Sequence, residues 1–238
     1  MLGLIRSDSG KIEILGKTPE LLGKEEREQI GVVMAGSGFN GYLSINDLIP
    51  IFDAMYQKFD KAWFLKECEK FKLPLKKKIK EFSTGMNRKL QILAALSHDA
   101  KLLILDEPTA GLDVVAREQI LNMLREYMET QGRSILISSH ISSDLEGFCD
   151  DLYMIDNGKI VLHEETDRLL EEYGVLKVSK EQYQGLDHTY ILKKHKDTFG
   201  YRCLTDQKQF YQENYPGIVI EKGNIDELII IMIQGEKI

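Results

Sequence analysis

Short, continuous apolar runs in the first half of the chain predict the strands of a buried parallel sheet. These runs are residues 30–34, 102–105 and 135–137. Between the last two, one face of a predicted helix is formed by Ile120, Leu124, Tyr127 and Met128. A strand, a helix and a strand with uninterrupted apolar runs are typical of a parallel sheet covered on both faces. We therefore expect an α/β fold.

Helical spacing dominates the region before the second run. Residues from Ser44 to about Leu73 follow this spacing and are rich in aromatic side chains. We interpret the aromatic residues at helical spacing as the core-facing side of a helix; they are Phe52, Tyr56, Phe59 and Trp63. Ser83 stands where an N-cap would, ahead of a helix with an apolar stripe. Alternation in residues 11–15 predicts a half-buried strand.

The last third of the chain has a different pattern. Two apolar segments flank the turn sequence Asp-Asn-Gly at residues 156–158 and predict a β-hairpin. After Glu164 we expect a short acidic helix, further strands, and a final helix that starts near Asn224 with Glu227 as its capping-box partner. We therefore divide the chain into a main domain, residues 1–163, and a small α+β accessory domain, residues 164–238.

Composition narrows the range of functions. The formal net charge of the 238 residues is −7, which argues against a general nucleic-acid binder. Cys68, Cys149 and Cys203 form no Cys-x-x-Cys pair, so we expect neither disulfides nor zinc, and a reducing cytoplasm fits best. The longest apolar run, residues 228–233, is far below the roughly 20 residues that span a bilayer. We expect any membrane association to come through a partner.

Adjacent carboxylates, Asp106 and Glu107, come directly after the apolar run at 102–105. Such charges are costly to desolvate unless a positive group compensates them, and a magnesium ion carried by a nucleotide is a natural partner. The pair alone is equally compatible with a helix cap or a structural salt bridge. His140 comes after the next apolar run, and open α/β sheets place their ligands at these strand ends.

Three motifs, in this order and spacing, resemble the ATP-binding subunit of an ABC transporter of the bacterial exporter type. They are Ser83-Thr-Gly-Met86, the segment 101–113 and Ser138-Ser-His140. The resemblance implies a P-loop NTPase (RecA-like) parallel sheet with an ABC helical subdomain at about 40–98, and ATP and Mg²⁺ as cofactors. It implies that Asp106 is the Walker B acid that holds Mg²⁺ through water. Glu107 is then the general base, and His140 hydrogen-bonds the γ-phosphate.

The resemblance assigns the remaining nucleotide contacts to two turns. Ser83, Thr84, Gly85 and Met86 occupy the family's signature, usually Ser-Gly-Gly-Gln, which grips the γ-phosphate of ATP bound to the opposite subunit. A hydroxyl, free amides and a helix N-terminus make an anion site. Thr84 replaces the first glycine and Met86 the glutamine, whereas the serine and the second glycine are kept. Asp113 matches the D-loop aspartate that crosses the dimer interface, and it can also cap the helix after it.

The sequence departs from the family pattern in two places. Ala35 stands where the family has its Q-loop glutamine, and alanine can neither ligate Mg²⁺ nor hydrogen-bond a water. The Walker A sequence Gly-x-x-x-x-Gly-Lys-Ser/Thr, which cradles the phosphates, does not occur in the 238 residues. We interpret residues 1–10 as the segment just after that loop's helix, and expect truncation or a start codon placed too far downstream. Paired with an intact subunit, the chain would complete a site by donating Ser83 and Gly85.

The function that the resemblance implies is ATP binding and hydrolysis that power transport, in the direction of export, through a separate transmembrane subunit. We expect residues near 40–75 to contact that subunit, a second ATP-binding subunit to complete a dimer, and a cytoplasmic, peripheral position on the inner face of the membrane. One alternative is a non-hydrolysing, degenerate or regulatory subunit, against which the retained Glu107 and His140 speak. Another is a soluble ABC ATPase acting on ribosomes or DNA, although the chain has no second cassette or long coiled-coil insertion.

Overall fold

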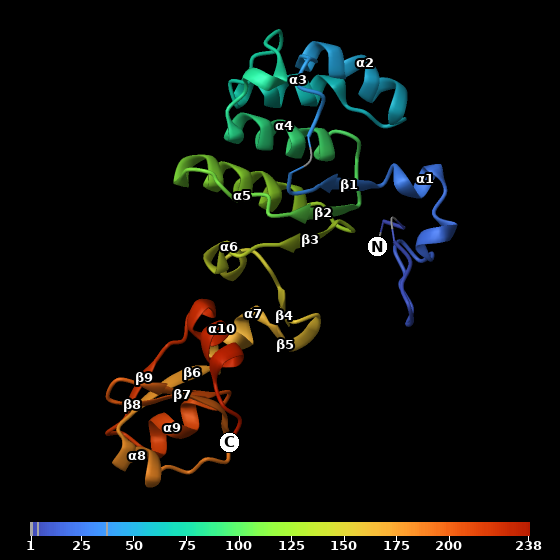
Figure 1. Cartoon of the computed structure of the whole chain (residues 1–238). Helices are drawn as coiled ribbons and strands as arrows, with labels where there is room; N and C mark the ends of the chain where they lie inside the picture. Colours follow the sequence, from blue (N-terminus) through green and yellow to red (C-terminus); the bar gives the residue numbers. More distant parts are fainter. Residues whose placement is uncertain (1, 4, 37) are drawn as a thin grey trace. The chain divides into compact units, whose positions relative to one another are not determined.

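The chain forms two compact units, Met1–His140 and Ile141–Ile238, each with its own sheet (Figure 1). The computed structural model describes residues 2–3, 5–36 and 38–238. The boundary expected at 163/164 falls inside strand β5 (Lys159–Glu165) of the second unit. The reason is that the hairpin before residue 164 packs with the rest of that unit, since Leu152 and Leu162 contact its core.

The first unit is built on a parallel sheet in the order β1-β2-β3, as the apolar runs predict. Its strands are β1 (Ile30–Val33), β2 (Leu102–Asp106) and β3 (Ser134–Ser138). Helix α4 (Thr84–Leu96) packs against β1, α3 and α5 (Val114–Met128). The remaining helices are η1 (Pro19–Leu21), α1 (Lys24–Arg27), α2 (Ile45–Met55), α3 (Lys61–Lys70) and η2 (Ile79–Glu81).

Two expectations for the first unit need correction. The predicted strand at 11–15 is wrong: an isolated bridge joins Ile14 to Lys17, because Leu15 and Gly16 take left-handed backbone angles and turn the chain. The helical stretch from Ser44 is two helices rather than one, because Tyr56 is extended and Asp60 caps a new helix. The core interpretation is confirmed for Phe52, which is buried and contacts the rings of its aromatic neighbours.

The second unit combines a β-hairpin with a four-stranded antiparallel sheet in the order β7-β8-β6-β9. The hairpin is β4 (Asp151–Asp156) and β5, and the sheet is β6 (Gly174–Val178), β7 (Ile191–Asp197), β8 (Gly200–Thr205) and β9 (Val219–Glu221). The helices are α6 (Ser142–Glu146), α7 (Thr166–Glu171), α8 (Lys180–Gln184), α9 (Lys208–Asn214) and α10 (Ile225–Gln234). The hairpin predicted around 156–158 is confirmed.

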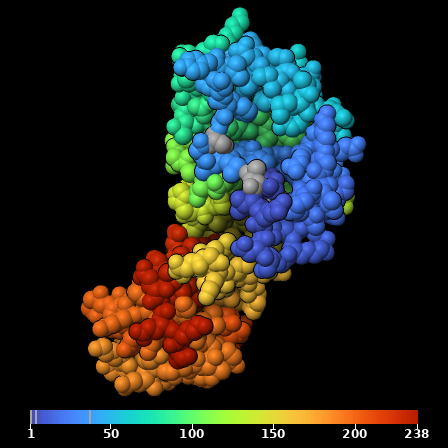
Figure 2. Space-filling model, turned by 45° about the vertical axis from the view of Figure 1, so that its right-hand side comes forward, coloured from blue at the N-terminus to red at the C-terminus, as the bar shows by residue number. Residues whose placement is uncertain are grey.

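Two apolar clusters, built from alternate residues of β6, form the core of the second unit. One contains Val175 with Leu228 of α10, and the other contains Leu176 with Tyr211 of α9. In the space-filling view α10 (red) lies beside the β4–β5 hairpin (yellow) (Figure 2). Asn224 caps α10 as predicted, accepting from the Glu227 amide at 2.8 Å. The Glu227 carboxylate lies 4.0 Å from an Arg202 nitrogen rather than closing the capping box.

All three cysteines are free thiols in the structure. Burial raises the pKa of the Cys68 and Cys203 thiols to about 12 and that of Cys149 to about 11, so none is a ready nucleophile near neutral pH. Among the described residues, no helix combines the length and the apolar character needed to cross a bilayer.

Candidate functional site

Asp106 ends β2 and is held by two donors at the carboxyl edge of the sheet. The register of the parallel pair places it opposite Ser138, the last residue of β3. The Ser138 hydroxyl donates to Asp106 Oδ1 at 2.6 Å, and the Ala35 amide donates to Oδ2 at 3.3 Å. The acid therefore has a fixed orientation while lone pairs of both oxygens stay available for a hydrated metal ion.

Glu107 meets His140 across the same edge. Its Oε2 lies 2.7 Å from His140 Nδ1, and the glutamate side chain is 24% exposed against 70% for the histidine. Oε2 is nevertheless buried, and its contact with the imidazole does not have the geometry of a hydrogen bond. A buried acceptor without a directed partner in the described residues is the kind of group that a water or a ligand would satisfy.

The backbone of Glu107 is strained, which is common at functional sites. Its φ is +50°, in the left-handed region that costs a non-glycine residue about 1–2 kcal/mol. The Glu107 amide donates to the carbonyl of Ser138 at 3.0 Å, which fixes the turn. The structure thus brings Asp106, Glu107 and His140 together, as expected from the two strand ends.

The turn that follows Asp106 and Glu107 places Asp113 at the N-cap of α5. Gly111, with φ of +72°, reverses the chain, and Asp113 Oδ1 accepts from the Ala116 amide at 2.9 Å. Its capping role is therefore real. Any role across a dimer interface would be additional to it.

Ser83 to Met86 form the N-terminus of α4, with Ser83 as the cap. The Ser83 hydroxyl accepts from the Met86 amide at 3.2 Å, Thr84 is the exposed first residue of the helix, and Met86 is half-buried. A methyl group added at Gly85 would lie 3.6 Å from Leu112 Cδ2 and 3.9 Å from Ala116 Cβ, which are ordinary contacts. Neither backbone angle nor crowding within this unit requires a glycine there.

The Ser83–Met86 turn and the Asp106–Glu107 pair are separate groups. Within the part of the chain that the structure describes, no hydrogen bond or ion pair joins them. This separation is compatible with two half-sites that serve different nucleotides.

The sequence alone assigned no role to two residues of this region. One is Ser138, whose signal is a hydroxyl at the end of a strand that runs beside an acid-bearing strand. The other is Arg88, half-buried on α4, which donates to Gln91 Oε1 at 3.2 Å. Burial lowers the pKa of Arg88, while the charges of Asp106 and Glu107 act to raise it. Its guanidinium is thus a cation whose field reaches both carboxylates.

The residues present fit Mg²⁺ only as a shared ion. No group of three or more His, Cys, Asp or Glu side chains among the described residues could hold a metal by itself. Mg²⁺ commonly uses one or two carboxylates together with water and substrate phosphates, and Asp106 can supply that one carboxylate. The amide cradle and lysine of the Walker A sequence are not among the 238 residues.

Comparison with known proteins identifies the family. Residues 1–110 match the model of the ABC transporter family. Nod factor export ATP-binding protein I of Neorhizobium galegae is 30% identical over 177 residues, which cover 72% of this chain and 51% of that protein. A solved ATP-binding subunit of an ABC transporter matches with a TM-score of 0.62 and 25% identity, over 71% of this chain and 72% of that one. This chain contains an ABC transporter ATP-binding domain.

Other relatives support the same family. Linearmycin resistance ATP-binding protein LnrL of Bacillus subtilis is 32% identical over 167 residues, which cover 67% of this chain and 52% of that protein. A dimeric ATP-binding cassette bound to ADP and Pi shares the fold, with a TM-score of 0.56 at 19% identity over 64% of this chain and 72% of that one. The predicted α/β fold of the P-loop NTPase class is confirmed. The chain spans about half the length of the curated relatives it matches.

Proposed function

We propose that this ABC transporter ATP-binding domain belongs to a subunit that binds and hydrolyses ATP to power export through a separate transmembrane subunit. The observation that carries the proposal is the convergence of Asp106, Glu107 and His140 at the carboxyl edge of a parallel sheet. Relatives named for export, such as Nod factor export ATP-binding protein I, support the direction.

In the proposed reaction the three side chains have distinct tasks. Asp106 would hold Mg²⁺ through water, and the ion would neutralise charge on the phosphates. Glu107 Oε2, buried and without a directed hydrogen bond, would accept the proton of the attacking water. His140 faces Glu107 with Nδ1, which leaves Nε2 to hydrogen-bond the γ-phosphate. A positioned general base contributes roughly 10²- to 10⁴-fold to a rate.

A second half-site would serve a nucleotide on another subunit. The Ser83 hydroxyl and the first amides of α4, including those of Thr84, Gly85 and Met86, would bind its γ-phosphate. Support comes from Gly85, because the fold gives no reason for a glycine at this position. Close approach of a phosphate to the backbone does give one. Asp113 would reach the same dimer interface.

The transmembrane subunit would contact the segment near 40–75. This segment exposes three large apolar side chains, Tyr42, Ile51 and Met55, around α2. Ile51 and Met55 lie one helical turn apart on α2, and neighbouring exposed apolar groups are typical of a protein contact. The protein would then lie on the cytoplasmic face of the cell membrane without spanning it, and we expect no nucleic-acid partner because its charge is −7.

Co-expression with the transmembrane subunit and an intact ATP-binding subunit tests this function. We expect the three proteins to purify together in detergent and to hydrolyse ATP. Met55→Lys should release the chain, whereas Met128→Lys, at an exposed methionine of α5, should not. Co-purification with ribosomes in place of the membrane protein, or equal behaviour of the two variants, would overturn the proposal.

A further inference from the structure

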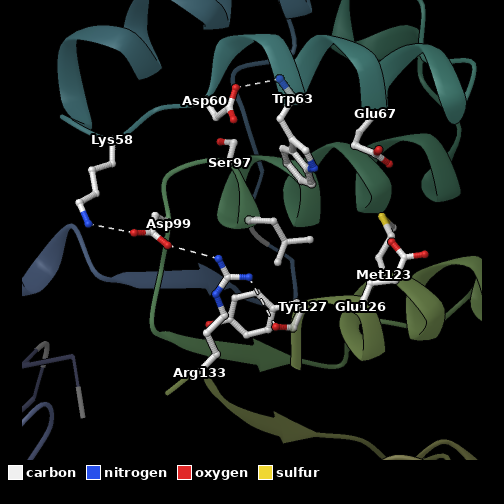
Figure 3. A pocket seen from close by; sticks show the side chains of 11 residues that line it. Lys58, Asp60, Trp63, Glu67, Ser97, Asp99, Met123, Glu126, Tyr127 and Arg133 are labelled. Atoms are coloured by element: carbon white, nitrogen blue, oxygen red, sulfur yellow. Dashed lines mark hydrogen bonds and ion pairs between the residues drawn. The ribbon is translucent and has the colours of Figure 1, made fainter. Parts of the chain in front are cut away.

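A cavity of about 630 Å³ opens in the first unit, lined by none of the residues assigned to the nucleotide (Figure 3). Its walls come from α3, the C-terminal end of α4, and α5, with Arg133 at one side. The volume is within the range of roughly 300–1,000 Å³ typical of small-molecule sites.

A single carboxylate, Asp99, pairs with both cations that line the cavity. Asp99 Oδ2 pairs with Lys58 Nζ at 2.9 Å, and Asp99 Oδ1 accepts from Arg133 Nη2 at 3.2 Å (Figure 3). The Arg133 guanidinium also lies 4.7 Å above the ring of Tyr127. Because these charges are used internally, they do not favour an anionic ligand.

The other charges leave one acid in excess. Glu67 and Glu126 share a lysine, Lys70, at 3.3 and 3.9 Å. Asp60, at the exposed start of α3, accepts from the Trp63 amide at 2.9 Å, and no cation among the described residues pairs with it. The four lining carboxylates thus exceed the two lining cations and Lys70 by one charge, and Asp60 is the carboxylate without a cationic partner in the described part of the chain.

Apolar groups form the wall beside this acid. Trp63, Leu96 and Met123 line the cavity, and the indole N–H of Trp63 makes no hydrogen bond with the residues that the structure describes. The face of an indole ring attracts cations, and it also packs against apolar groups. A negative group beside an aromatic and aliphatic wall is complementary to an organic amine.

We propose that this cavity binds a small amine whose ammonium group faces Asp60 and whose apolar body packs against Trp63, Leu96 and Met123. Such a ligand would contact α3, α4 and α5 together and would stabilise the first unit by an amount that rises with the logarithm of its concentration above Kd. The inference does not depend on the transporter function, because it uses none of the proposed nucleotide contacts.

Trp63 is the single tryptophan of the chain, so its fluorescence reports on the cavity directly. The probes are n-hexylamine, n-hexanol and hexanoate, which share an apolar chain and differ in charge. We expect a saturable change in fluorescence and a higher melting temperature with the amine alone, at concentrations of about 1–10 mM for so small a ligand.

Asp60→Asn separates the ammonium contact from the fold, because asparagine caps a helix as well as aspartate does. It should weaken n-hexylamine binding by about three- to fivefold, the effect of one exposed ion pair. Asp53→Asn, at an exposed acid of α2, should leave binding unchanged. Equal binding of n-hexanol, no saturable response to the amine, or an Asp60→Asn variant that binds like the unchanged protein would each overturn the proposal.

Discussion

The hydroxyl of Ser138 donates a 2.6 Å hydrogen bond to Oδ1 of Asp106, across the last register pair of β2 and β3. The orientation of this acid is therefore set by the neighbouring strand. A hydrogen bond to a charged group is worth about 1.5–3 kcal/mol.

A double-mutant cycle on this pair gives the first prediction. Ser138→Ala should lower the free energy of unfolding by about 1.5–3 kcal/mol, and by much less in an Asp106→Asn background, where the charged acceptor is gone. Urea unfolding followed by Trp63 fluorescence measures both, since Trp63 lies in the first unit. Ser134→Ala, at the other end of β3, serves as the control. Additive effects of the two substitutions would show that the residues are not coupled.

The left-handed backbone angle of Glu107 should lower the free energy of unfolding. Because its φ is +50°, Glu107→Gly relieves left-handed strain and should raise the free energy of unfolding by up to about 1 kcal/mol. Glu129→Gly, at φ of −62°, relieves nothing and should lower it by about 1 kcal/mol. The same urea titration compares the two variants, and an equal loss in both would disprove the strain.

Two glycines of the first unit should respond differently to alanine. A Cβ at Gly31 would lie 2.5 Å from Leu103 Cδ2 and 2.7 Å from the carbonyl of Ala95, so Gly31→Ala should cost about 1–3 kcal/mol. Gly85→Ala meets only ordinary contacts and should leave the melting temperature unchanged or higher. Thermal unfolding of the two variants checks this, and strong destabilisation by Gly85→Ala would give that glycine a purely structural reason.

His98 should make the first unit sensitive to acid. It is buried, stacks on Tyr56 with ring centroids 4.0 Å apart, and donates from Nδ1 to the carbonyl of Glu28 at 3.0 Å. Burial lowers the pKa of His98 from its ordinary value of 6.5, against the opposing effects of that carbonyl and of nearby carboxylates.

The His98 imidazole therefore binds a proton more readily in the unfolded chain than in the folded protein. Stability from His98 is complete above pH 6.5 and is lost as the pH falls from there through the folded pKa. Urea unfolding between pH 5 and 7.5 should show that the free energy of unfolding declines toward acid pH. The His98→Gln substitution should reduce this pH dependence. His195→Gln, on β7 of the other unit, should not. An unchanged slope in His98→Gln would contradict the assignment.

The sequence predicted the central sheet because its strands read as unbroken apolar runs. The expectation that the sheet is covered on both faces does not hold for β3, whose residues alternate between exposed and partly buried. The meeting of Asp106, Glu107 and His140 came from the rule that neighbouring parallel strands end at one edge. The partner of the Ser138 hydroxyl and the place of Arg88 could not be predicted, since strand register and helix rotation depend on packing. The strand predicted at 11–15 failed because alternation cannot distinguish a strand from a tight turn such as the one at Leu15 and Gly16.

The helical pattern from Ser44 onward predicted one helix where the structure has two. Periodicity continued through Tyr56, although Asp60 supplied the side-chain oxygen that could start a second helix. The expected domain boundary differs from the division into two compact units because the 152–162 hairpin carries no compositional change, whereas its side chains contact the core of the second unit.

The most direct test of the account is whether Ser83 acts on a nucleotide held by another subunit. An intact ABC ATP-binding subunit whose own signature serine is changed to alanine should hydrolyse ATP poorly alone. We predict that adding this chain restores hydrolysis and that adding Ser83→Ala does not. Ser179→Ala, which removes the equivalent cap of α8, should restore it fully. Equal restoration by Ser83→Ala, or none by the unchanged chain, would contradict the account.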